Sequence, residues 1–226
     1  DISGLSVAAR YADQGALDQR SLAKACRRVG SQLWVVTGLS SPRNWTAIRP
    51  ASLNRLWKVC AENFDRVVID AGSSLHVGQV DDPLAIPSTP RDCANVSAIS
   101  ASDICVCVSQ YSPDGVLRLL HHLPAIQQAS TSQPVIVVNR TSRKTSECLL
   151  QIQESLQASR WSGLLWPIAD DRAVYDCAIR GSLLKESRKT RKTRSSLMRL
   201  ATRLSGEAQA LGGAKTTTRS PILAHS

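Results

Sequence analysis

Short apolar runs alternate with amphipathic segments along the 226 residues of this chain. The runs are too uniformly apolar to alternate between a buried and an exposed face, which is typical of strands buried on both faces in parallel sheets. Five such runs are predicted to be strands: residues 32–37, 66–70, 104–109, 134–139 and 164–168. The last is the weakest candidate because Pro167 lies inside it.

Apolar positions at helical spacing lie between these runs. They predict helices over residues 17–29, 50–63, 113–129, 146–159 and 171–180. Asp18 is a candidate N-cap, and Gly181 is a good residue to follow a helix end. Residues 71–102 are rich in Pro, Asp and Ser and predict a long loop with a short helix near 94–100. The alternation predicts an α/β fold with three layers, a mostly parallel sheet and right-handed crossovers.

The composition is that of a folded globular protein, with 42% hydrophobic and 20% charged residues. The longest apolar runs are about five residues, whereas a membrane-spanning helix needs roughly 20. The formal net charge of +10 is concentrated at the C-terminal end, since residues 180–226 hold eleven Lys or Arg and two Glu. The rest of the chain is close to neutral. This distribution favours an attached basic segment over a uniformly basic domain.

The basic segment is predicted to be a helix over residues 185–211, followed by a disordered tail over 212–226. Three interpretations of its charge run, Lys185 to Arg203, remain open. It forms a solvated helix face, it is attracted to anionic lipid, or it binds the DNA backbone. Lipid attraction would place a cytoplasmic protein at the inner face of the membrane.

Seven cysteines are present, without the spacing of a zinc site. Cys105 and Cys107 lie two apart in an apolar run and therefore face the same side of a predicted strand. We interpret the cysteines as small buried hydrophobic residues in a reducing compartment, and expect a cytoplasmic protein. His121 and His122 are adjacent on a predicted helix, so they point to different faces and do not form a metal pair.

Polar residues end two of the predicted strands, where open parallel sheets bind ligands. Asp70 ends the run 66–70, where a carboxylate either helps to hold Mg²⁺ or caps the following turn. Asn139 ends the run 134–139, where its amide either reads adenine with one donor and one acceptor or starts a turn.

Several short motifs occur in a fixed order. They are GLSVAARYA (4–12), WVVTG (34–38), RPASL (49–53), VVIDAG (67–72), TPRDCA (89–94), ASDICVCV (101–108), VVNR (137–140) and ADDRAVYDCAI (169–179). Together they resemble the MinD/ParA branch of the P-loop NTPases, and most closely its CpaE-like members. The resemblance covers roughly residues 4–184, and residues 1–184 would form the nucleotide-binding domain.

This resemblance implies an ATP- and Mg²⁺-binding protein that forms a homodimer around two nucleotides. It would switch dimerisation or partner binding in cell division, chromosome partition or pilus and secretion assembly. By the same resemblance Asp70 would be the Walker B acid at the metal and Asn139 would read adenine. Asp170 would lie in the loop beside the base, and Asp114 in a loop that approaches the partner subunit.

The sequence departs from the family pattern in two places. Ala169 stands where relatives carry Pro before the acidic pair. The glycine-rich phosphate-binding loop is absent, and Gly213-Ala214-Lys215-Thr216 does not replace it because Ala214 stands where the motif needs Gly. In relatives this loop and the general base would precede Asp1. We therefore expect no catalytic residue and no hydrolysis in this chain as it stands, and an ATPase if an upstream phosphate-binding loop exists. The alternative is a non-catalytic scaffold that binds partners, anionic membrane or DNA through its basic tail.

Overall fold

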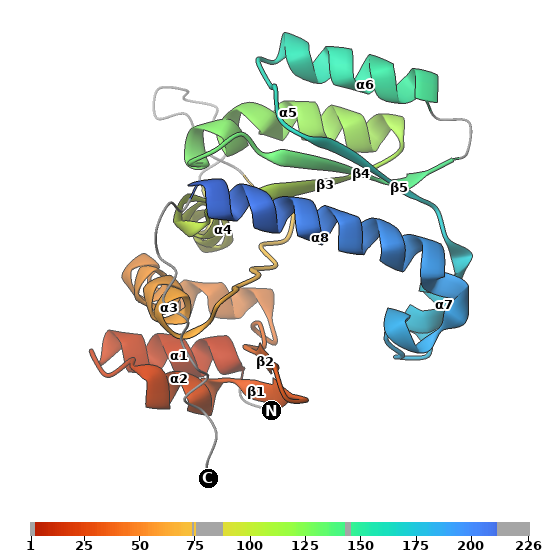
Figure 1. Ribbon diagram of the computed structural model, residues 1–226. Coiled ribbons are helices and arrows are strands. Elements are labelled where there is room, and N and C mark those ends of the chain that lie inside the picture. Colours follow the sequence, from red (N-terminus) through yellow and green to blue (C-terminus); the bar gives the residue numbers. More distant parts are fainter. Residues whose placement is uncertain (1–2, 74, 76–87, 143–145, 212–226) are drawn as a thin grey trace. The chain divides into compact units, whose positions relative to one another are not determined.

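The computed structural model describes residues 3–73, 75, 88–142 and 146–211, the side chains of residues 146 and 207–211 excepted. The chain divides into two compact units, Asp1–Ala101 and Ser102–Lys215. The fold is of the α/β class with a three-stranded parallel sheet (Figure 1). The predicted tail at 212–226 lies outside the described residues, and so does the sequence at 213–216 that was compared with a phosphate-binding loop.

The first unit consists of helices and one small hairpin (Figure 1). Its elements are α1 (Gly4–Asp13), α2 (Gln19–Ala25), β1 (Arg27–Val29), β2 (Leu33–Val35), the 3-10 helix η1 (Pro42–Ala47), α3 (Pro50–Asn63) and α4 (Pro90–Ala101). The helix expected at 50–63 is confirmed, and Asp18 caps α2 as predicted. The strand expected at 32–37 is antiparallel, because β2 pairs with β1.

A buried cluster from α1, α2, α3 and α4 holds this unit together. Leu5, Leu22, Leu53 and Leu56 are among its members, each less than a tenth exposed. Helix α1 begins against the segment that follows β2, because Thr37 accepts two hydrogen bonds there. The Gly4 backbone N–H donates to Thr37 Oγ1 (2.8 Å) and the Leu5 N–H donates to Thr37 O (2.9 Å). This contact joins the first two motifs of the resemblance.

The strand predicted over residues 66–70 is wrong. These residues form no regular secondary structure, and the side chain of Val68 is 95% exposed. Among the described residues no strand pairs with this segment, so its β-branched residues have no ladder of hydrogen bonds to join. The short helix expected near residues 94–100, within the predicted loop, is longer than expected: α4 begins at Pro90 and ends at Ala101.

The second unit is built around the parallel sheet, with strands in the order β3-β4-β5. Its elements are β3 (Val106–Gln110), α5 (Pro113–Ala129), β4 (Val135–Thr141), α6 (Ser146–Ala158), β5 (Leu165–Ala169), α7 (Arg172–Ile179), the 3-10 helices η2 (Leu184–Glu186) and η3 (Arg188–Thr190), and α8 (Arg191–Leu211). Three predicted strands and three predicted helices are thus confirmed within one or two residues. Pro167 is accommodated in β5, which lies at an edge of the three-stranded sheet.

Helices cover both faces of this sheet (Figure 1). Side chains of α5 and α6, such as Leu123 and Leu156, pack with Ile136 and Val138 on one face. The other face buries Val135, Val137 and Ile168 under Leu200 of α8. The apolar stripe of the basic helix is therefore part of the core of this unit.

The seven cysteines are free thiols, but they are not uniformly buried. Cys60 and Cys177 are buried as expected, whereas Cys93 and Cys148 are exposed. The expectation of buried residues is wrong for these two, because Cys93 lines an open groove between α3 and α4 and Cys148 lines an open hollow between α5 and α6. No helix among the described residues has the length and apolarity to cross a bilayer.

Candidate functional site

Two of the predicted site residues lie at the carboxyl ends of neighbouring parallel strands. Asn139 is near the end of β4, opposite Ile168 in β5, and Asp170 follows β5 directly. The Asp170 backbone N–H donates to the Thr141 carbonyl oxygen (3.0 Å), which extends the pairing of the two strands to the predicted site. Because parallel strands end at one edge, the sheet places the amide of Asn139 and the carboxylate of Asp170 at that edge.

The Asn139 side chain is held by its own neighbour. Its Oδ1 accepts a hydrogen bond from the Arg140 backbone N–H (2.9 Å), while its carbonyl oxygen accepts from the Tyr111 N–H (2.8 Å). This bond joins neighbouring residues within β4, which continues to Thr141, so the turn-starting role considered for Asn139 is not seen. Within the described residues Nδ2 donates no hydrogen bond, and Oδ1 keeps a second lone pair. The amide can still offer one donor and one acceptor to a ligand.

Arg140 interrupts the regular pairing at the same place. It lies between Asn139 and Thr141, where the register of β4 against β5 shifts. Its φ of 62° is in the left-handed region, which non-glycine residues adopt rarely. The guanidinium carbon lies 4.7 Å from the centre of the Tyr175 ring in α7, within range of a cation–π contact. No pattern in the sequence predicts this planar, positively charged surface beside Asn139.

The two residues of the acidic pair have different roles. Asp171 caps α7, because its Oδ1 accepts from the Ala173 N–H (3.0 Å), and its Oδ2 accepts from Thr193 Oγ1 of α8 (2.6 Å). Asp170 is exposed at the strand end. Only Asp170 of this pair is thus presented at the surface for a ligand.

Asp114 lies in the first turn of α5, which Ser112 caps by accepting from the Gly115 N–H (3.1 Å). It is exposed, and a carboxylate in a first helical turn is stabilised by the helix dipole. A Cβ at Gly115 would collide with the carbonyl oxygen of Gln110, so a glycine is needed where α5 leaves β3. This geometry gives Asp114 a structural role beside the one that the resemblance implies.

Asp70, the predicted metal ligand, belongs to the first unit, whereas the other three belong to the second. Its Oδ1 accepts from the Gly72 N–H (3.4 Å), and Gly72 has a φ of 73°, which glycine adopts without strain. The turn-capping alternative for Asp70 is therefore seen. Across the described residues no three side chains of His, Cys, Asp or Glu are grouped closely enough to hold a metal ion.

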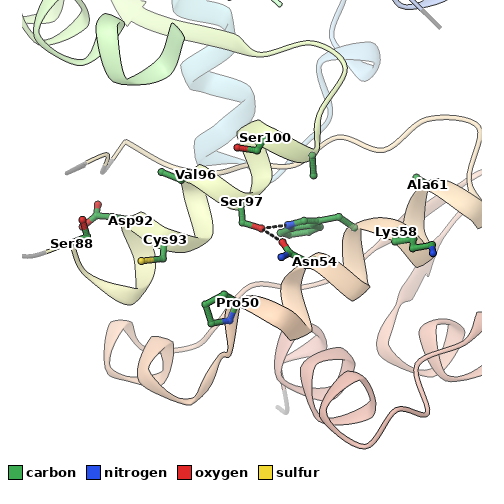
Figure 2. Close-up of a pocket in the computed structure, with 12 residues that line it drawn as sticks. Pro50, Asn54, Lys58, Ala61, Ser88, Asp92, Cys93, Val96, Ser97 and Ser100 are labelled. Carbon is green, nitrogen blue, oxygen red and sulfur yellow. Dashed lines mark hydrogen bonds between the residues drawn. The ribbon is translucent and has the colours of Figure 1, made fainter. Parts of the chain in front are cut away.

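A groove of about 800 Å³ lies between α3 and α4 in the first unit. Its polar groups bond to one another, since Trp57 Nε1 donates to Ser97 Oγ (2.9 Å) and Ser97 Oγ donates to Asn54 Oδ1 (2.7 Å). Figure 2 shows Ser97 and Asn54 facing each other across the groove. These contacts hold the two helices together and leave the wall largely apolar.

The motif Thr89-Pro90-Arg91-Asp92 at the groove's edge has a structural explanation that the resemblance did not supply. Thr89 Oγ1 accepts from the Asp92 N–H (3.2 Å), and the Asp92 carboxylate accepts from the Thr89 N–H (2.9 Å). This reciprocal pair is a capping box, and its Thr-x-x-Asp spacing is readable from sequence.

A second hollow, of about 600 Å³, lies between α5 and α6 in the second unit and reaches Ser112 and Pro113 beside Asp114.

Comparison with known proteins identifies no family for this chain, and therefore no known function for this hollow or for the sheet edge. No protein-family model matches the chain, and no curated protein is significantly similar to it.

Proposed function

We propose that this chain is the base-binding part of an ATP-dependent switch protein of the MinD/ParA type, similar to its CpaE-like members. The observation that carries the proposal is the pairing of β4 with β5, which brings Asn139 and Asp170 to one edge of a parallel sheet. These residues belong to two motifs of the resemblance, 137–140 and 169–179, which are remote from each other in sequence and become neighbours in the sheet. The three-layer arrangement of the second unit supports a P-loop NTPase-like fold.

Each proposed group supplies a defined interaction. The Asn139 amide would bond the edge of the adenine ring, with Nδ2 donating and Oδ1 accepting. Asp170 would accept from the exocyclic amine, and Asp70 would hold Mg²⁺ through water. ATP binding would then control dimerisation, with Asp114 near the partner subunit. The chain contains no phosphate-binding loop motif, so the proposal concerns base binding, and hydrolysis is proposed only for a protein that supplies that loop.

Titration of the intact protein with a fluorescent ATP analogue tests this proposal. We expect Asn139→Ala to weaken binding about tenfold, the loss of one or two hydrogen bonds to a ligand. Asp70→Ala should weaken binding only when Mg²⁺ is present. Asn44→Ala, an exposed asparagine in the first unit, is the control. Equal affinity of Asn139→Ala and wild type would contradict the proposal.

A second candidate function is a scaffold that binds an anionic surface, and the exposed charge of η2, η3 and α8 favours it. Eight Lys or Arg lie between residues 185 and 203 with one acid, Glu186. Seven of them are exposed: Lys185, Arg188, Lys189, Arg191, Lys192, Arg199 and Arg203. Because Leu200 is buried against the sheet, this binding would come from charge and not from insertion of the apolar stripe.

Truncation before α8 is a poor test of the scaffold, since it would also uncover Val135 and Val137. Changing Arg188, Lys189, Arg191 and Lys192 to Gln removes charge and leaves the buried contacts in place. We expect this variant to lose binding to vesicles that contain anionic lipid, or to duplex DNA, while its unfolding midpoint stays unchanged. If binding persists at wild-type strength, the basic face does not act as the docking surface.

A further inference from the structure

The thiols of Cys105 and Cys107 form a pair at the start of β3. Their Sγ atoms are 3.9 Å apart, and both side chains are half-buried. Cys107 packs against the core cluster under α5 and α6. Cys105 precedes the strand, and its carbonyl oxygen accepts from the Val135 N–H (2.8 Å). Among the described residues no other two cysteine thiols are hydrogen-bonded to each other.

The pair is chemically asymmetric. A thiolate at Cys105 can accept a hydrogen bond from the Cys107 thiol, and this lowers the pKa of Cys105. The same hydrogen bond, together with burial, raises the pKa of Cys107. Cys105 is therefore the better nucleophile of the two at neutral pH, and Cys107 remains a thiol within reach of it.

We propose that Cys105 and Cys107 are an oxidisable dithiol, which a low-molecular-weight disulfide converts into an intramolecular disulfide. The Cys105 thiolate attacks one sulfur of the small disulfide, forms a mixed disulfide and releases one thiolate. The Cys107 sulfur then loses its proton and attacks Cys105 Sγ, which releases the second thiolate. The two protein thiols are oxidised, the small disulfide is reduced, and the two protons end on the two released thiols.

The backbone makes this disulfide reversible. Residues two apart in an extended chain have Cα atoms about 6.6 Å apart, near the upper end of the range that disulfides bridge. The sulfur atoms must approach from 3.9 Å to about 2.05 Å, and a bond that spans so wide a Cα separation is strained. Strained disulfides are more oxidising than structural ones and are reduced readily by cellular thiols. A reducing compartment would thus keep the pair reduced until the glutathione pool is oxidised.

Equilibration of the intact protein in glutathione buffers of increasing oxidised fraction tests the proposal. Remaining thiols are alkylated, and the peptides are identified by mass after tryptic digestion. Because cleavage at Arg91 and Arg118 leaves Cys93 in the same peptide, the experiment uses a Cys93→Ser background. We expect that peptide to lose the mass of two hydrogens and both alkylation sites. Cys107→Ser should instead retain a glutathione adduct on Cys105.

Cys148, an exposed cysteine in α6, is the matched control, and it should form only a mixed disulfide with glutathione. Two results would overturn the proposal. In the first, the 92–118 peptide stays fully alkylated at ratios where Cys148 already carries glutathione. In the second, Cys107→Ser carries no adduct on Cys105. The first result needs no substitution in the pair, so it holds even if Cys107→Ser fails to fold.

Discussion

The Asp171 carboxylate bonds Thr193 of α8 with one oxygen, at 2.6 Å from Thr193 Oγ1, and caps α7 with the other. One side chain thus fixes the helix that follows the candidate site to the basic helix that covers the sheet. Ligand binding beside Asp170 and movement of α8 would therefore be connected through the next residue in the chain.

Asp171→Ala should destabilise the second unit by about 1–3 kcal/mol, because it removes a helix cap and a hydrogen bond to Thr193. Thr193→Val removes the second of these interactions alone, so its effect should be near 1 kcal/mol. Urea unfolding of both single variants and of the double variant measures the difference. Strict additivity of the two effects would show that the contact between Asp171 and Thr193 contributes nothing.

Gly4→Ala should destabilise the first unit by about 1–3 kcal/mol, the usual cost of an overpacked site. A Cβ at Gly4 would collide with the Ala25 carbonyl oxygen and lie 3.0 Å from the Thr37 backbone nitrogen. Gly38 is the matched control, since a Cβ there meets nothing within 4 Å and its φ is not positive. The thermal midpoint of Gly38→Ala should match that of the wild type. If both variants lower the midpoint equally, the close contacts at Gly4 are not the cause of the destabilisation.

The second unit could be predicted from sequence to a large extent. Its strands contain apolar runs such as the one within Val135–Thr141, and its helices begin where expected, after caps at Ser112 and Asp171. Local propensity and the observed elements agree there, so the pattern specifies each element, although Val106 and Val108 of β3 are exposed and the expected burial on both faces is not met. The positions of Asn139 and Asp170 at one edge follow once the strands are parallel.

The first unit was less predictable because its structure depends on partners remote in sequence. Residues 66–70 have the composition of a buried strand, yet Val67 and Val68 are exposed, since composition supplies a propensity and not a pairing partner. Gly4 and Thr37 are bonded through a contact that no local pattern encodes. In the second unit the left-handed backbone of Arg140 could not be predicted either, because arginine has no preference for that region.

The cap of α2 should depend on pH. The Ser21 backbone N–H and hydroxyl donate to the Asp18 carboxylate, at 2.8 Å each, and these bonds lower the Asp18 pKa from 3.8. Because the folded-state pKa is lowered, the contribution is complete above the unfolded value of 3.8 and is lost as the pH falls through the folded value. Asp18→Asn keeps a capping side chain that does not titrate, so the difference in unfolding free energy between wild type and variant should shrink in acid. A difference that stays constant from pH 7 to pH 3 would argue against this role.

Leu200 is the residue that best distinguishes between a helix packed on the sheet and a helix available to lipid. It is 7% exposed and packs on Val135, Val137 and Ile168, so Leu200→Ala should cost about 2–5 kcal/mol. Met198 is two residues away and 68% exposed, and Met198→Ala should change stability by no more than about 0.5 kcal/mol. Denaturant unfolding of both variants measures these values. Small and equal effects would mean that α8 leaves the sheet in solution. Its apolar stripe would then be open to insertion into lipid, and the scaffold would bind by insertion as well as by charge.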